Sequence, residues 1–291
     1  MRKTSSKAMS KRAGNKGQHL GLLARLSCPD MSLPNFDVSD DPGPSFFQLL
    51  KQRNELGYDV ANLDKSDLIE ITHGTTVVAA KFSGGVVIAG DRRATSGNLI
   101  SYRTMRKVFP ADRSSAVAIA GAAGPAIEMV KMFQLQLEHY EKVEGRTLST
   151  EGKANQLSQM LRAHLPAAMQ GMVVVPIFAG FDEAKTAGRL FAFDVTGGRY
   201  EESDYVTSGS GSMFAKTAIK LDFDIDASED ETIDLLIKAL FTAADDDSAT
   251  GGPDKIRGIY PMVATITADG YSEVEESDVA TRFDRLLGER N

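Results

Sequence analysis

The chain has 291 residues and a formal net charge of −7, and 42% of its residues are hydrophobic and 25% charged. These values are typical of a globular protein of one large or two small domains, and the acidic balance disfavours nucleic acid as the main partner. A single cysteine, Cys28, excludes an internal disulfide and indicates a reducing compartment. No apolar run approaches the roughly 20 residues of a membrane span, and four histidines with one cysteine disfavour a structural zinc site. We expect a cytoplasmic protein with no membrane, no nucleic acid, no metal and no cofactor.

The first 74 residues differ in composition from the rest of the chain. Residues 1–27 contain lysine and arginine but no acidic side chain. We interpret them as a disordered basic tail; the alternatives are a targeting peptide, a nucleic-acid arm or a translation start at Met31. Residues 28–74 contain a loop-like stretch and a short amphipathic segment without a core of their own. We therefore interpret residues 1–74 as an extension and residues 75–291 as the folded domain.

After residue 74 the sequence predicts a series of strands and helices. Two β-rich runs, 75–82 and 86–93, flank a hairpin-like turn, and residues 114–121 form another apolar strand. Apolar residues at helical spacing predict helices over 124–145 and 148–171, the second with Thr150 as its N-cap. The remaining predicted elements are strands at 172–181 and 188–198, helices at 212–221 and 232–244, a strand at 258–270 and a helix at 279–290. This order favours an α+β fold with antiparallel sheets and helices packed outside.

The dipeptide Gly74-Thr75 stands directly before the first strand. A threonine hydroxyl needs an adjacent base to become a nucleophile. If the bond before Thr75 were cut, its new α-amine, with a pKa of about 8, would lie next to its own hydroxyl and could accept the proton. Glycine at position 74 leaves the bond unobstructed and permits unusual backbone angles. The simpler interpretation is a loop glycine before a β-branched strand.

Other polar residues follow predicted strands. Asp91 comes directly after the second strand, and Lys107 lies between apolar residues at the start of another strand-like stretch. A partly buried lysine needs an acidic partner, for which Asp91 is a candidate. Gly121 lies at a strand-to-helix junction, where backbone N–H groups can stabilise an oxyanion. A solvated lysine, a turn aspartate and a plain turn are the ordinary alternatives.

Two further segments resemble known loops only superficially. Residues 207–215 look like a phosphate loop but lack the Gly-Lys-Ser/Thr that would complete it. Residues 244–252 look like an acidic metal loop, but Gly251 falls one place late for a calcium loop and no glutamate closes it. We assign neither function.

Five segments together resemble the β-subunits of proteasomes of the actinobacterial 20S type. They are "HGTTVVAAKFSGGVVIAGDRRAT", "MRKVFP", "AIAGAAG", "GSGS" and "DDDSATGGPD", in this order. The resemblance extends over about residues 74–270. It implies the four-layer αββα sandwich of the N-terminal-nucleophile hydrolases, and it implies that residues 1–74 are a propeptide of a zymogen.

The resemblance assigns roles to residues of this chain by their place in the shared motifs. It implies a threonine endopeptidase that cleaves itself between Gly74 and Thr75, with Thr75 as nucleophile and base. The residues implied to assist are the acid–lysine pair Asp91 and Lys107, the oxyanion donor Gly121, and Ser210 and Asp247, which orient the amine. Thr250 stands where the family has a serine, and whether it substitutes fully is open.

The resemblance also implies a specificity pocket and partners. The implied pocket is apolar and predicts cleavage after hydrophobic residues; its members are Ala94, Met105, Phe109, Ile119, Ala123 and Ile127. Thr95 and Ala123 would bind the substrate backbone as an added strand. Partners would be proteasome α-subunits and other β-subunits in stacked heptameric rings, a regulatory ring ATPase, and unfolded protein substrates that carry a tag.

Three other functions stay open at this point. They are a two-ring bacterial protease without α-subunits, a non-catalytic structural ring subunit, and a small-molecule amidase of the same superfamily. The presence of Thr75, Asp91 and Lys107 favours a catalytic subunit. An amidase would act as a simple oligomer without an α partner.

Overall fold

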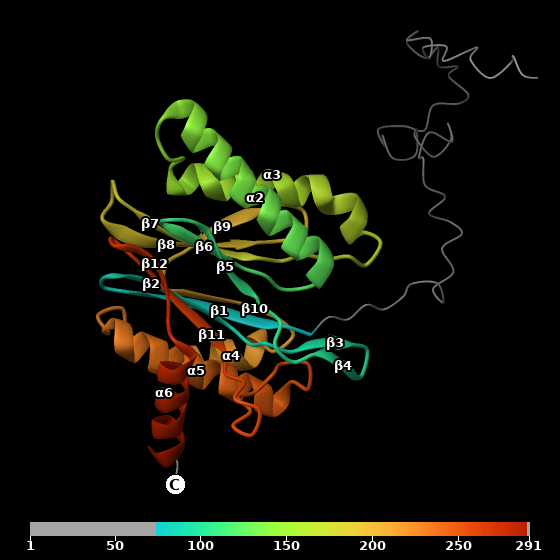
Figure 1. Cartoon of the computed structure of the whole chain (residues 1–291), viewed down its shortest axis with the longest axis vertical. Coiled ribbons are helices and arrows are strands. Elements are labelled where there is room, and N and C mark those ends of the chain that lie inside the picture. Colours follow the sequence, from blue (N-terminus) through green and yellow to red (C-terminus); the bar gives the residue numbers. More distant parts are fainter. Residues whose placement is uncertain (1–73, 290–291) are drawn as a thin grey trace, which may run out of the picture. The chain divides into compact units, whose positions relative to one another are not determined.

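The computed structural model describes residues 74–289. The interpretations of residues 1–73 as a basic tail and amphipathic segment lie outside this range. The described part has two five-stranded antiparallel sheets that stack face to face, with helices on both outer faces (Figure 1). The predicted four-layer αββα architecture is confirmed.

The first sheet carries the start of the domain. Its strand order is β10-β1-β2-β11-β12, and all its pairings are antiparallel. Its strands are β1 Thr76–Phe82, β2 Gly85–Gly90, β10 Tyr205–Gly209, β11 Met262–Thr267 and β12 Gly270–Glu273. Helices α4 Ser212–Asp222 and α5 Glu229–Asp246 cover its outer face, and α6 Glu276–Glu289 packs against α5.

The second sheet has the order β5-β6-β7-β8-β9. Its strands are β5 Val108–Asp112, β6 Ser115–Ala118, β7 Ile177–Asp182, β8 Ala187–Phe193 and β9 Arg199–Glu202. Helices α2 Ala123–Glu144 and α3 Thr150–Ala168 cover its outer face. A separate hairpin of β3 Ala94–Ser96 and β4 Leu99–Tyr102 follows β2.

Residues of one strand alternate between two cores, as the two-residue period of a strand requires. In β1, Val77 and Ala79 point into the core between the sheets, whereas Val78 and Ala80 point into the core under α4 and α5. A third core lies between the second sheet and α2 and α3. Because β1 is buried on both faces, the packing fixes the position of its first residue, Thr76.

Several boundaries differ from the sequence-based expectation. The N-cap of α3 is Ser149, whose hydroxyl accepts from the N–H of Gly152, and the buried hydroxyl of Thr150 donates instead to the carbonyl of Phe181. The strand expected at 172–181 begins only at Ile177, after Pro176, because proline has no N–H to donate to a sheet. The elements that sequence patterns missed are short strands at sheet edges and in a separate hairpin: β3, β4, β9, β10 and β12.

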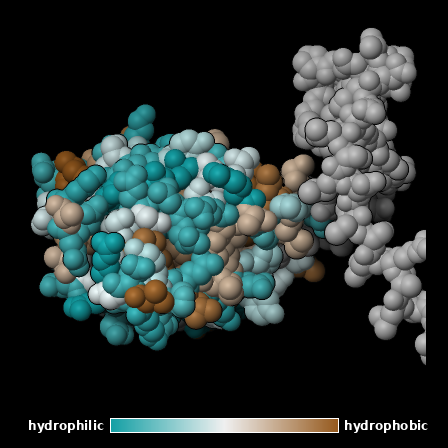
Figure 2. All heavy atoms as spheres, turned by 90° about the horizontal axis from the view of Figure 1, so that it is seen from above, coloured by the Kyte–Doolittle hydropathy of each residue, from teal (hydrophilic) through white to brown (hydrophobic). Residues whose placement is uncertain are grey.

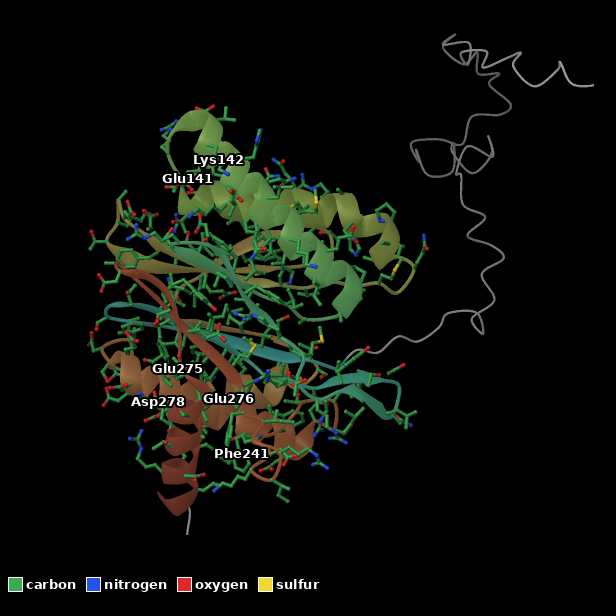
Figure 3. All side chains as sticks on the ribbon, in the orientation of Figure 1. Glu141, Lys142, Phe241, Glu275, Glu276 and Asp278 are labelled. Carbon is green, nitrogen blue, oxygen red and sulfur yellow. The ribbon has the colours of Figure 1, made fainter. Side chains whose placement is uncertain are left out.

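The surface seen from above in Figure 2 is largely hydrophilic with scattered apolar side chains. Acidic side chains gather at the start of α6, where Figure 3 labels Glu275, Glu276 and Asp278. Within residues 74–289, no helix is both long and apolar enough to cross a membrane.

Candidate active site

Thr75 lies immediately before β1 and is 4% exposed. Its carbonyl oxygen accepts hydrogen bonds from the backbone N–H of Ser210 at 2.9 Å and from the Ser210 hydroxyl at 3.4 Å. These contacts follow from the pairing of β1 with β10, in which Thr76 is opposite Gly209. Gly209 has φ +103°, and a Cβ there would lie 1.8 Å from the Thr75 carbonyl oxygen. Only glycine therefore permits this close approach.

Asp91 and Lys107 form a buried ion pair beside the start of β1. The Nζ of Lys107 is 2.6 Å from Oδ1 of Asp91, and both side chains are 0% exposed. The same Oδ1 accepts from the N–H of Thr76 at 2.8 Å, and Oδ2 accepts from the N–H groups of Arg93 and Gly251, each at 2.8 Å. Asp91 thus joins the predicted lysine to the residue directly after Thr75. A buried carboxylate with four donors is fully compensated.

Burial lowers the pKa of Lys107 below its ordinary value because the charged ammonium is deprived of water. The charge of Asp91 and its hydrogen bond oppose this shift without overcoming it. Nζ also donates to the carbonyl of Arg93 at 2.5 Å. A lysine held in this way gives up a proton more readily than a solvated one, which suits acid–base work next to a hydroxyl.

A second network of side chains also reaches the start of β1. Oδ2 of Asp247, the C-cap of α5, accepts from the hydroxyls of Ser210 and Thr250, each at 2.5 Å. The hydroxyl oxygen of Thr250 is 2.6 Å from that of Thr76, which in turn accepts from the N–H of Gly211 at 2.9 Å. Because Thr250 uses its proton on Asp247, the proton between the two threonines belongs to Thr76. Thr250 therefore reaches Asp247 with its hydroxyl.

Thr76 is a residue that the sequence-based analysis missed. It is 0% exposed, and its N–H and its hydroxyl bind Asp91 and Thr250, so it connects both networks. The sequence shows a repeated threonine after Gly74. This repeat does not distinguish Thr76 from an ordinary β-branched strand residue.

Gly121 follows β6 and forms an isolated bridge with Val174. Its φ is +102°, and a Cβ there would lie 2.2 Å from the carbonyl oxygen of Val173. Two residues earlier, the N–H of Ile119 donates to the carbonyl of Lys107 at 2.9 Å, so this segment runs beside the lysine. The position requires glycine for a physical reason, whichever role its N–H has.

Gly74 is buried, and its N–H donates to the hydroxyl of Thr95 at 3.1 Å. Thr95 lies in β3, next to the buried Ala94. Gly74 is thus held by the strand that was predicted to bind the substrate backbone. Ala123, the other predicted backbone contact, is the first residue of α2.

Four predicted pocket residues are together in the structure. Met105, Phe109, Ile119 and Ile127 all belong to the core between the second sheet and α2 and α3, and only Ile119 is fully buried. Ala94 and Ala123 are not part of this cluster. The apolar character of the predicted pocket therefore rests on four side chains that pack as one group. Among residues 74–289, no three His, Cys, Asp or Glu side chains gather as they would to hold a metal ion.

Comparison with known proteins identifies the family of this chain. Residues 71–257 match the family model described as "Proteasome subunit". Similar proteins include the proteasome subunit beta of Acidimicrobium ferrooxidans, 52% identical over 89% of this chain and 96% of the relative. Others are the proteasome subunit beta of Streptomyces griseus, 58% identical over 73% of this chain and 76% of the relative, and that of Acidothermus cellulolyticus, 53% identical over 76% and 78%.

The family match covers well over half of the chain, and each of the three relatives is aligned over more than two thirds of its length. The two stacked antiparallel sheets between helices are the fold that this family predicts. The chain belongs to the proteasome subunit family and is a β-subunit, the threonine-type endopeptidase of the bacterial 20S proteasome.

Proposed function

We propose that Thr75 is the nucleophile of this endopeptidase and that the chain activates itself by cutting the Gly74–Thr75 bond. The observation that carries the proposal is the buried Asp91–Lys107 pair, at 2.6 Å, bonded to the residue directly after Thr75. Lys107, with its lowered pKa, would supply a base for the Thr75 hydroxyl.

In the self-cleavage, Oγ of Thr75 attacks the carbonyl carbon of Gly74 and transfers its proton to the base. The C–N bond then breaks, and the Thr75 nitrogen takes up a proton and leaves as a free amine. The resulting ester between Gly74 and Oγ is hydrolysed by water, which releases the extension as a carboxylate. The mature subunit repeats this chemistry on a substrate peptide, with the Thr75 amine as base.

The other site residues would orient the Thr75 amine, stabilise the oxyanion and hold the substrate. Ser210 and Asp247 would orient the Thr75 amine, since Ser210 already contacts the Thr75 carbonyl and Asp247 anchors Ser210. The N–H of Gly121 would bind the oxyanion of the tetrahedral intermediate. The apolar pocket of Met105, Phe109, Ile119 and Ile127, extended by Ala94 and Ala123, would select hydrophobic residues, with Thr95 and Ala123 holding the substrate as an added strand.

As a β-subunit, the chain assembles with α-subunits in a 20S core. Our proposal adds stacked heptameric rings of α- and β-subunits in the cytoplasm, served by a ring ATPase that delivers unfolded, tagged proteins. Residues 1–74 would be the propeptide that caps the nucleophile until assembly, and residues 75–291 the catalytic domain.

The test is the intact mass and N-terminal sequence of the chain co-expressed with its α-subunit, beside a Thr75→Ala variant. We expect a mature chain that begins Thr75-Thr76-Val77 in the wild type and an uncut chain in the variant. An uncut wild-type chain in fully assembled particles would overturn the proposal and indicate a non-catalytic ring subunit.

A further inference from the structure

Ala249 touches the place where a side chain of residue 74 would be. A Cβ built on Gly74 would lie 1.8 Å from the Cβ of Ala249, 2.7 Å from its Cα and 3.0 Å from its carbonyl oxygen. The first two separations are far inside van der Waals contact, so a side chain at position 74 requires movement of one of the two segments.

The segment that carries Ala249 has little room to move. The N–H of Ala249 donates to Oδ1 of Asp247 at 3.1 Å, and the neighbouring carbonyl of Ser248 accepts from Nη1 of Arg93 at 2.8 Å. The hydroxyl of Thr250 is fixed to Asp247, and the N–H of Gly251 is fixed to Asp91. The turn is therefore anchored at four successive residues, three of them to the carboxylates of Asp91 and Asp247 and Ser248 to the guanidinium of Arg93.

The facing segment is held as well. The N–H of Gly74 donates to the hydroxyl of Thr95, and the carbonyl of Thr75 is bound by Ser210. Gly74 is buried between these anchors and Ala249. A peptide acyl group bound to the Thr75 nitrogen therefore fits between these segments only when the residue directly before Thr75 is glycine.

We propose that Ala249 is a steric barrier that restricts the acyl group on the Thr75 nitrogen to glycine, and that this barrier protects the mature enzyme. The proposal rests on the proposed function of Thr75. During peptide hydrolysis, the substrate's acyl group is bound to Oγ as an ester, next to the free α-amine. Attack of that amine on the ester carbonyl would form an amide and release Oγ, which takes up the amine's proton. This is the reverse of the first step of self-cleavage, and it would cap the nucleophile again.

Ala249 makes transfer of the acyl group from Oγ back to the amine unfavourable unless the acyl group ends in glycine. The amide product would carry its Cβ into the methyl group of Ala249, whereas the glycyl amide of the uncut chain does not. Water therefore has time to hydrolyse the ester before the amine captures it. Ala249 is a positioning residue in this scheme, because it does not act on the reacting atoms.

The first measurement is the self-cleavage rate of Gly74→Ala chains with and without Ala249→Gly, assembled with α-subunits. We expect Gly74→Ala to slow cleavage about 100-fold, because the clash displaces the carbonyl carbon of residue 74 from Oγ of Thr75, and we expect the second change to recover about tenfold. Recovery is partial because the Cα of residue 249 remains 2.7 Å from the new Cβ. Ser248→Gly is the matched control, since it loosens the same turn without removing the methyl group, and it should recover nothing.

The second measurement follows the mature Ala249→Gly enzyme during turnover of a peptide cleaved after a non-glycine residue. We expect progressive loss of activity together with a Thr75 peptide that carries the acyl mass and resists hydroxylamine, which removes esters but not amides. Wild type and Ser248→Gly should keep their activity and a free Thr75.

The results separate the barrier from the proposed function. A wild-type chain that is never cut would overturn the proposed function itself. A wild type that is cut, with no recovery in Gly74→Ala/Ala249→Gly or with equal recovery by Ser248→Gly, would overturn the barrier alone. An Ala249→Gly enzyme that turns over without amide formation would overturn the protective role.

Discussion

The hydroxyl oxygens of Thr76 and Thr250 are 2.6 Å apart, although 174 positions separate the two residues in the chain. Through this bond Thr76 is connected to Asp247, and through its N–H the same residue is connected to Asp91. The start of β1 is thereby fixed from two sides. The position of Thr75 is a consequence of both contacts.

We predict that Thr76→Val lowers stability and slows self-cleavage, whereas Thr76→Ser retains both. Valine has nearly the same shape but leaves the buried N–H of Gly211 and the acceptor on Thr250 without their partner. Such a loss costs about 1–3 kcal/mol of the free energy of unfolding. Chemical denaturation and the rate of appearance of the mature mass measure the two effects. If valine left the cleavage rate unchanged, the hydroxyl would have no positioning role.

Lys107 and Lys153 form a matched pair for separating chemistry from stability. Both are buried and both bind an aspartate at 2.6 Å, Lys107 with Asp91 and Lys153 with Asp112. Removing either partner of a buried ion pair costs about 3–5 kcal/mol. We predict that Lys107→Met and Lys153→Met destabilise the subunit similarly, but that only Lys107→Met abolishes self-cleavage and peptide hydrolysis in assembled particles. Loss of both activities in the Lys153 variant would argue that buried charge, and not chemistry, is what these assays detect.

The lowered pKa of Lys107 predicts the direction of the pH dependence. If its neutral form accepts the hydroxyl proton, self-cleavage accelerates as the pH rises through that pKa, which lies below 10.5. Asp91 raises the pKa of Lys107 against the effect of burial, so Asp91→Asn should shift the rising limb of the rate profile to lower pH. Residual cleavage rates measured across pH for both chains test this. A limb that stayed in place or moved to higher pH would exclude Lys107 as the titrating base.

The same shift has a consequence for stability. Between its lowered pKa and 10.5, Lys107 binds fewer protons in the native state than in the unfolded chain. Its contribution to the free energy of unfolding therefore increases as the pH rises within this window. Denaturation of the Thr75→Ala chain, compared with Thr75→Ala/Lys107→Met across pH, isolates this contribution without interference from self-cleavage.

Gly209 and Gly97 test the close approach to the Thr75 carbonyl. Both have positive φ, +103° and +56°, so alanine is strained at either position. At Gly209 the added Cβ would also lie 1.8 Å from the Thr75 carbonyl oxygen, whereas at Gly97 nothing lies within 4 Å. We predict that Gly209→Ala prevents self-cleavage and that Gly97→Ala leaves its rate within about twofold. N-terminal sequencing after a fixed time compares them, and equal behaviour would contradict the prediction.

The proposed pocket predicts which peptides are cut. Met105 is partly buried against the apolar cluster that contains Phe109, Ile119 and Ile127. A carboxylate at position 105 would face a hydrophobic substrate side chain, so Met105→Glu should lower kcat/KM for reporters cleaved after hydrophobic residues by about tenfold or more. The exposed Met132 on α2 provides the control variant, Met132→Glu. A wild-type enzyme that preferred acidic or basic reporters would contradict the pocket assignment.

The sequence by itself determined the types and order of the long elements. Continuous β-rich runs predicted β1 and β2, which are buried on both faces, and apolar residues at helical spacing predicted all five described helices. It also determined the residues that carry the shared motifs, including Thr75, Asp91 and Lys107. Short edge strands such as β9 and β12 escaped because four residues of mixed burial have no distinctive period.

Only the tertiary structure decided how these residues meet. Ser210 reaches Thr75 because β10 pairs with β1, and Thr250 reaches Thr76 because it follows the end of α5, which packs against β1. The close approach of Ala249 to Gly74 also depends on the tertiary structure. Neither residue has a reactive or polar side chain from which the sequence could have predicted it. Steric exclusion and hydrogen-bond direction depend on distances of a few tenths of an ångström, and those are fixed by packing across the whole domain and not by any local run of residues.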